Sequence, residues 1–105
     1  MKVYRTDLYL KWITKLKDNK GKAIIRARLR RMHLSGNFRD FEKVSKSVYE
    51  LKIDYGPGYR IYLTLRETKI IILLLGGDKS SQARDIKKAE RMATSTRIEE
   101  KEEWY

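Results

Sequence analysis

Three side chains of this chain, Lys52, Arg60 and Tyr62, are suited to holding a phosphate group. Arginine offers a planar fork for two phosphate oxygens, and lysine offers a mobile point charge. Tyrosine can stack on a nucleobase or donate its hydroxyl. RNA brings its own nucleophile, the 2′-hydroxyl, so such a set could cleave it by aligning that hydroxyl and neutralising the transition state. The alternative is that charged strand residues serve solubility alone.

Two alternating segments place these side chains on one face of a sheet. Apolar and polar residues alternate from Val48 to Asp54 and from Tyr59 to Leu65, which predicts two half-buried strands. The intervening Gly56-Pro57-Gly58 is typical of a tight turn. The helix-side face carries Tyr49, Leu51, Ile53, Ile61 and Leu63. The open face carries Lys52, Arg60 and Tyr62 side by side, with Glu50 and Asp54 as groups that could take a proton.

The other elements follow from hydrophobic spacing. The pattern predicts a strand over Lys2–Arg5, a doubly covered strand over Lys69–Leu75 that ends at Gly76-Gly77, and helices over Leu8–Lys17, Lys20–His33 and Ser81–Ala93. Thr6 or Asp7 is expected to cap the first helix, and the second is expected to turn Ile24, Ala27 and Leu34 inward. This order predicts an α+β domain, with an N-terminal helical hairpin on one face of a small antiparallel sheet and a C-terminal helix.

The charge of the chain points to an anionic partner. Among 105 residues, 25 Lys and Arg stand against 14 Asp and Glu, a formal net charge of +11. Met92–Tyr105 carries two basic residues against four glutamates, a net of −2, which leaves +13 on Met1–Arg91. A segment with this positive charge is suited to binding nucleic acid or an acidic protein. The basic second helix, with Arg28 and Arg31, could add affinity for RNA or the ribosome.

Several classes of protein are excluded or disfavoured. The absence of cysteine excludes disulfides, thiol nucleophiles and thiolate metal sites, and a single histidine excludes a multi-histidine metal centre. No cofactor or metal is expected. The most apolar run, Ile70–Leu75, is far shorter than the roughly 20 residues that span a bilayer. The N-terminus has no signal-peptide pattern, so we expect a cytoplasmic protein without a membrane partner.

Two sequence blocks carry a family resemblance. YELKIDYGPGYRIY from Tyr49 to Tyr62, followed by LLLGGDKSSQARDI from Leu73 to Ile86, resembles the RelE/ParE superfamily of bacterial toxins, and within it the HigB-like addiction module killer proteins. The resemblance covers Thr6–Ala93, so residues 1–93 are expected to form one toxin domain and residues 94–105 a charged tail. It implies a RelE-like fold and metal-free cleavage of mRNA in the ribosomal A site. The implied partners are the ribosome, mRNA and a helix-turn-helix antitoxin. The chain would contact operator DNA only through this antitoxin.

The resemblance also implies roles for single residues. Arg60 and Lys52 match strand residues of the family site, and Lys79 lies where the family has a basic residue after the third strand; these three are expected to be catalytic. Further substrate contacts are expected from Glu50, Asp54, Tyr59, Tyr62, Arg28 and Arg31. The family's C-terminal catalytic Tyr or His has no match, since Ile86 falls near that position. Three alternatives therefore stay open: a ParE-like gyrase inhibitor, a toxin with weak catalysis that acts mainly as an antitoxin partner, and a plain RNA-binding domain.

Overall fold

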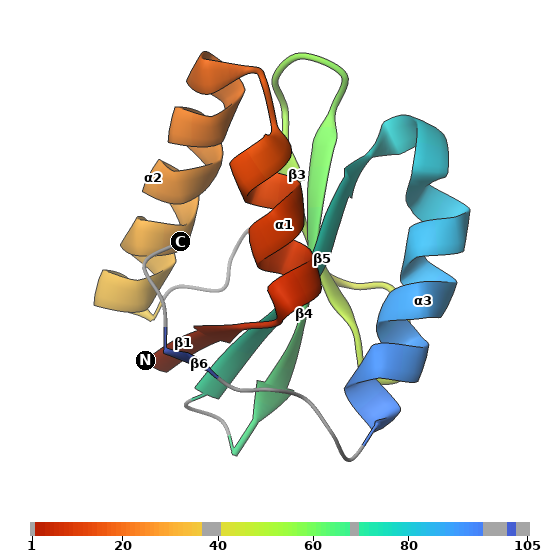
Figure 1. Cartoon of the computed structure of the whole chain (residues 1–105). Coiled ribbons are helices and arrows are strands. Elements are labelled where there is room, and N and C mark those ends of the chain that lie inside the picture. Colours follow the sequence, from red (N-terminus) through yellow and green to blue (C-terminus); the bar gives the residue numbers. More distant parts are fainter. Residues whose placement is uncertain (1, 37–40, 68–69, 96–100, 103–105) are drawn as a thin grey trace.

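A single mixed sheet organises the chain. The computed structural model describes residues 2–36, 41–67, 70–95 and 101–102 (Figure 1). Its strands are β1 (Lys2–Arg5), β2 (Phe41–Lys43), β3 (Tyr49–Ile53), β4 (Tyr59–Arg66), β5 (Ile70–Asp78) and β6 (Lys101–Glu102). They lie in the order β2-β3-β4-β5-β1-β6, and every pair is antiparallel except β1 with β5. The sequence patterns did not predict the short strands β2 and β6.

Local capping groups set the helices. These are α1 (Asp7–Lys15), α2 (Asn19–Ser35) and α3 (Gln82–Thr94), the last preceded by a 3-10 turn, η1 (Lys79–Ser81). Thr6 caps α1 by accepting a hydrogen bond from the backbone N–H of Tyr9 at 3.1 Å, and Asp18 caps α2 in the same way. Gly36, at φ 65°, ends α2 in the left-handed region. The predicted α+β class is confirmed. None of the helices in the described ranges is long and apolar enough to cross a membrane.

Helices cover both faces of the sheet (Figure 1). On one face, α1 and α2 pack on β3, β4 and β5 through residues such as Ile13, Ile25 and Leu51. On the other, Ala89 of α3 packs on Tyr62 and neighbouring β5 side chains. The expectation of a sheet with one open face was therefore wrong in part, because the C-terminal helix occupies the second face over β4 and β5.

The inward face of α2 also differs from the prediction. The structure buries Gly21, Ile25, Leu29 and Met32, which recur every three or four residues. The residues expected to be inward were Ile24, Ala27 and Leu34. Of these, Ile24 is only half-buried, Ala27 is exposed, and Leu34 is 74% exposed. Basic residues are spread around this helix and interrupt its apolar stripe, so the spacing of apolar residues alone did not show which face of α2 packs on the sheet.

Two glycines let the helices approach β5 closely. The strand continues through Gly76 and Gly77 to Asp78 rather than stopping at the glycines. A Cβ at Gly76 would collide with the indole ring of Trp12 on α1, and one at Gly77 would collide with the Asp85 carboxylate on α3. The glycine pair is thus a place of close packing on both faces rather than a strand terminator.

The C-terminal tail lies mostly outside the described residues. Lys101–Glu102 forms β6 and pairs with Tyr4 and Arg5 of β1, whereas Glu99, Glu100 and Glu103 fall outside the described ranges. The division into a domain of residues 1–93 and a tail of residues 94–105 stays a prediction.

Glu90 ties the β2–β3 connection to α3. One of its carboxylate oxygens accepts hydrogen bonds from the Ser45 hydroxyl at 2.5 Å and from the Ser47 backbone N–H at 2.8 Å. These hydrogen bonds lower the pKa of Glu90 below its ordinary value. A carboxylate with a depressed folded-state pKa stabilises the fold above its ordinary pKa, and this contribution is lost as pH falls through the folded pKa.

A pH-dependent stability effect follows from Glu90. We expect Glu90→Gln to lower the urea midpoint at about pH 7 and to differ less from the wild type as the pH falls through the depressed folded-state pKa of Glu90, because the wild-type carboxylate then becomes protonated. Urea unfolding over this pH range measures the difference. An equal loss at every pH would show that the Glu90 charge contributes nothing.

Candidate active site

The β3–β4 hairpin sets two basic side chains opposite each other. Its register pairs Lys52 with Arg60, as the alternation predicted, and continues from Arg60 to Gly77 on β5. Gly58, at φ 78°, closes the connecting turn. The Lys52 side chain is 55% exposed, and its Nζ lies 3.6 Å from a carboxylate oxygen of Glu42, which is 65% exposed. An ion pair this exposed contributes little to the free energy of folding. Lys52 is therefore accessible to an anion.

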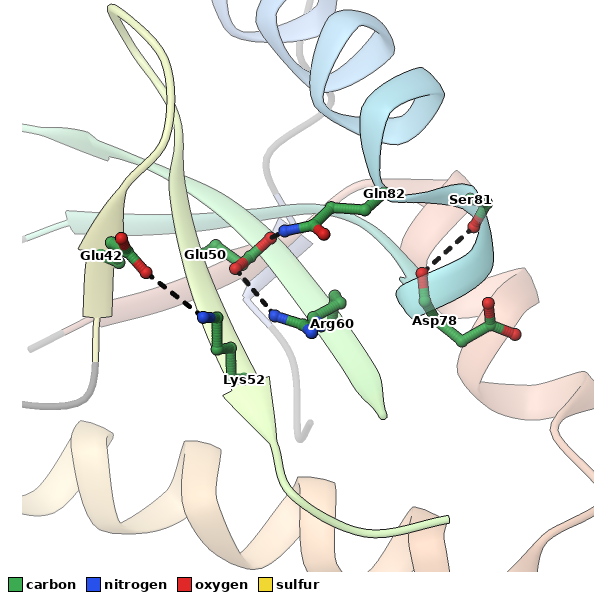
Figure 2. Close-up of polar contacts among 7 residues, drawn as sticks. All are labelled: Glu42, Glu50, Lys52, Arg60, Asp78, Ser81 and Gln82. Atoms are coloured by element: carbon green, nitrogen blue, oxygen red, sulfur yellow. Dashed lines mark hydrogen bonds and ion pairs between the residues drawn. The ribbon is translucent and has the colours of Figure 1, made fainter. Parts of the chain in front are cut away.

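Arg60 is held by a buried carboxylate. Its Nη1 donates to Glu50 Oε1 at 3.1 Å, and the side chains of Arg60 and Glu50 are 11% and 1% exposed. The second oxygen of Glu50 accepts a hydrogen bond from Gln82 Nε2 at 2.8 Å (Figure 2). Glu50 was expected to contact substrate, but its burial and its two partners make it a support for Arg60.

The Glu50 contacts preorganise the guanidinium. An arginine whose position is fixed in a low-dielectric site loses less entropy on binding a phosphate than a free surface arginine. Figure 2 shows Arg60 between the Lys52 side chain and the turn that carries Asp78 and Ser81. An anion that approaches over the hairpin would therefore meet the exposed Lys52 ammonium first, with the fixed and mostly buried Arg60 guanidinium beside it.

Lys79 and Asp54 lie at the turn end of this face. Lys79 opens η1, two residues after the cross-strand partner of Arg60, and a Cβ at Gly58 would lie 3.6 Å from Lys79 Cβ. Asp54, which follows β3, is exposed. The structure thus brings Lys79 to the same end of the hairpin as Arg60 and leaves both Lys79 and Asp54 accessible.

Tyr62 is not on an open surface. The structure buries it completely beneath α3, because Ala89 and the half-buried Ile86 pack over it. Burial, followed by the charges of Glu50 and Asp85, raises the pKa of its hydroxyl well above the ordinary value. The expectation that Tyr62 stands exposed beside Lys52 was wrong, and stacking on a base would require α3 to move.

Three other expected substrate residues lie on the opposite side of the sheet. Tyr59 is 6% exposed and donates its hydroxyl to Asp18 at 2.8 Å; burial and this hydrogen bond raise its pKa to about 12. Arg28 is half-buried and Arg31 exposed on α2, which packs on the face away from Lys52. The structure does not bring these residues together with Arg60.

Two polar residues of α3 escaped the sequence interpretation. Gln82 holds Glu50, and Asp85, which is almost buried, accepts a hydrogen bond from the Ser81 hydroxyl at 2.5 Å. Both belong to the quoted GGDKSSQARDI block, but no local pattern indicates that the Gln82 side chain reaches Glu50 on β3. Over residues 2–36, 41–67 and 70–95, no three His, Asp or Glu side chains gather as a metal site would need.

Comparisons with known proteins agree with this architecture. The fold resembles a chain in the crystal structure of the intact E. coli RelBE toxin-antitoxin complex, with a TM-score of 0.60 and 16% identity over 73% of this chain and 94% of that one. An uncharacterized protein of Haemophilus influenzae is 48% identical over 82 residues, 78% of this chain and 82% of the relative. The expected RelE-like superfamily is thereby confirmed at the level of fold. Residues 11–96 match the description "Phage derived protein Gp49-like (DUF891)", and the chain therefore belongs to the Gp49-like family of phage-derived proteins.

Proposed function

We propose that this chain is the toxin of a type II toxin–antitoxin system and that it cleaves mRNA on the ribosome without a metal ion. The observation that carries the proposal is Arg60, fixed by buried Glu50 directly opposite Lys52. One solved structure that shares the fold is a toxin–antitoxin complex, which supports the same class of function. The basic charge of +11 supports an RNA substrate.

The proposed reaction uses the RNA's own nucleophile. The 2′-oxygen attacks the adjacent phosphorus, the bond to the 5′-oxygen breaks, and a cyclic phosphate forms. Arg60, Lys52 and Lys79 bind the phosphate and neutralise the charge that develops on its oxygens. Asp54 is an exposed carboxylate at this end of the hairpin that can take the proton of the 2′-hydroxyl. A protonated lysine can return a proton to the leaving oxygen.

Controlled expression of this chain without an antitoxin, which type II systems encode beside the toxin, tests the proposal. We expect growth arrest together with new mRNA 5′ ends inside translated reading frames, and loss of those ends when translation is blocked beforehand. Sequencing of mRNA ends measures this result. Intact mRNA in arrested cells, with gyrase-dependent DNA breaks, would instead identify a ParE-like inhibitor. Normal growth with intact mRNA would overturn the toxin assignment.

A further inference from the structure

A second surface, separate from the Lys52–Arg60 pair, lies between α1 and α3. Here the helices flank the Gly76 end of β5 and leave a groove of about 440 Å³. Figure 1 shows β5 running between these two helices. The groove is lined by Leu8, Lys11, Trp12, Lys15, Leu16, Leu75, Gly76, Asp85 and Lys88.

The groove has an apolar floor and a basic rim. Leu8 and Trp12 supply apolar surface above the buried Leu75, and within the described residues only Leu8 and Leu34 are large apolar side chains left exposed. Three exposed lysines, Lys11, Lys15 and Lys88, stand around this floor. The acidic lining residue, Asp85, is nearly buried and already accepts the Ser81 hydroxyl. The surface is therefore built for an apolar group that carries negative charge beside it.

The floor also includes a strand edge without a partner strand. Within the described residues, β1 pairs with β5 only from Ile70 to Leu73. At the end of this pairing, the Thr6 backbone N–H and hydroxyl donate hydrogen bonds to the carbonyls of Leu73 and Leu74. Beyond them, Leu75 and Gly76 face the groove. Leu75 is 4% exposed and Gly76 lies against the Trp12 ring, so this end of β5 forms the closed floor of the groove.

Two occupants fit the groove poorly. A second copy of this chain, docked by the same face, would bring the three rim lysines of each copy together. The described part of the chain's own tail, Lys101–Glu102, pairs with β1 rather than with the groove. The charge of the rim therefore favours a different chain.

We propose that this groove binds an acidic segment of the antitoxin that inserts at least one large apolar side chain. The proposal rests on the toxin function proposed above. The apolar side chain packs on Trp12 and Leu8, and neighbouring carboxylates pair with the rim lysines. The site lies apart from Lys52, so the groove can be altered without changing the phosphate-binding pair.

Charge reversal of the rim tests the groove. The probe is the purified protein encoded by the reading frame adjacent to this gene, and its dissociation constant is measured by calorimetry. We expect Lys11→Glu, Lys15→Glu and Lys88→Glu together to weaken binding about tenfold or more. Leu8→Asp, at a position already 36% exposed, tests the apolar part without opening the core. The matched control reverses three exposed lysines that do not line the groove, Lys2, Lys20 and Lys43, with the same change in net charge.

The outcomes separate this inference from the proposed function. Weaker binding by the rim variant and Leu8→Asp, with near-normal binding by the control, supports the groove. If both groove variants bind normally and the chain still arrests growth, the groove is not the binding site, and the proposed toxin function is unaffected. If the rim and control variants weaken binding equally, the effect comes from net charge alone, and the proposal that the groove is the binding site is refuted. A wild-type chain that neither arrests growth nor binds the neighbouring protein refutes both proposals.

Discussion

Arg60→Ala, made in a chain that also carries Glu50→Gln, is expected to lower RNA cleavage by about 100-fold to 1,000-fold, the usual effect of removing one electrostatic contact to a transition state. The Glu50→Gln change prevents the loss of Arg60 from leaving a buried carboxylate unpaired. Cleavage of mRNA on purified ribosomes measures the rate, and circular dichroism confirms that the variant is folded.

Three further variants sharpen the Arg60 result. Arg60→Lys keeps a charge beside Glu50 but removes the planar fork, so we expect activity between those of the wild type and the alanine variant. Glu50→Gln alone reports any effect of the supporting carboxylate. Arg91→Ala, at an exposed arginine on α3, is the matched control and should cleave normally. Full activity of the folded Arg60 variant would remove Arg60 from the proposed site.

Loss of the Glu50 carboxylate is expected to cost about 3–5 kcal/mol of folding free energy, because it leaves the Arg60 guanidinium buried without a counter-ion. Glu42→Ala is the matched control, since Glu42 also pairs with a basic hairpin residue but is 65% exposed. Its expected cost is about 0–1 kcal/mol. Urea unfolding of Glu50→Ala and Glu42→Ala gives both numbers.

A paired replacement isolates the electrostatic part of the Glu50 effect. Glu50→Leu with Arg60→Met removes both charges and fills similar volume, so it should recover most of the stability lost by Glu50→Ala. If the paired variant is as unstable as Glu50→Ala, the loss comes from packing or from the Gln82 hydrogen bond instead.

The hairpin was predictable because its information is local. Alternation on either side of a Gly-Pro-Gly turn fixed the strands, and the strands fixed the Lys52–Arg60 pairing. The first helix cap was equally local, since Thr6 contacts Tyr9 three residues later. Such features need no knowledge of the remaining chain.

The errors arose where a distant segment decides the environment. Tyr62 alternates with apolar neighbours just as Arg60 does, and only the path of α3 distinguishes a buried position from an exposed one. The Gln82 contact to Glu50 spans 32 residues of sequence and has no local signature. In the second helix, Ile24 and Ile25 are adjacent apolar residues, and only the packing of α2 on the sheet determines that Ile25 is the buried one.

The parallel pairing of β1 with β5 gives the fold a high contact order. Thr6 reaches Leu74 across 68 residues, so the first strand has no neighbour in the sheet until the central strand has been synthesised. Loop closure of that length makes such contacts slow and late to form. The guanidinium of Arg60 also lacks its complete support until Gln82 has emerged. Lys52 and Arg60 therefore reach the geometry described here only after the segments from β1 to the start of α3 have been synthesised and packed together.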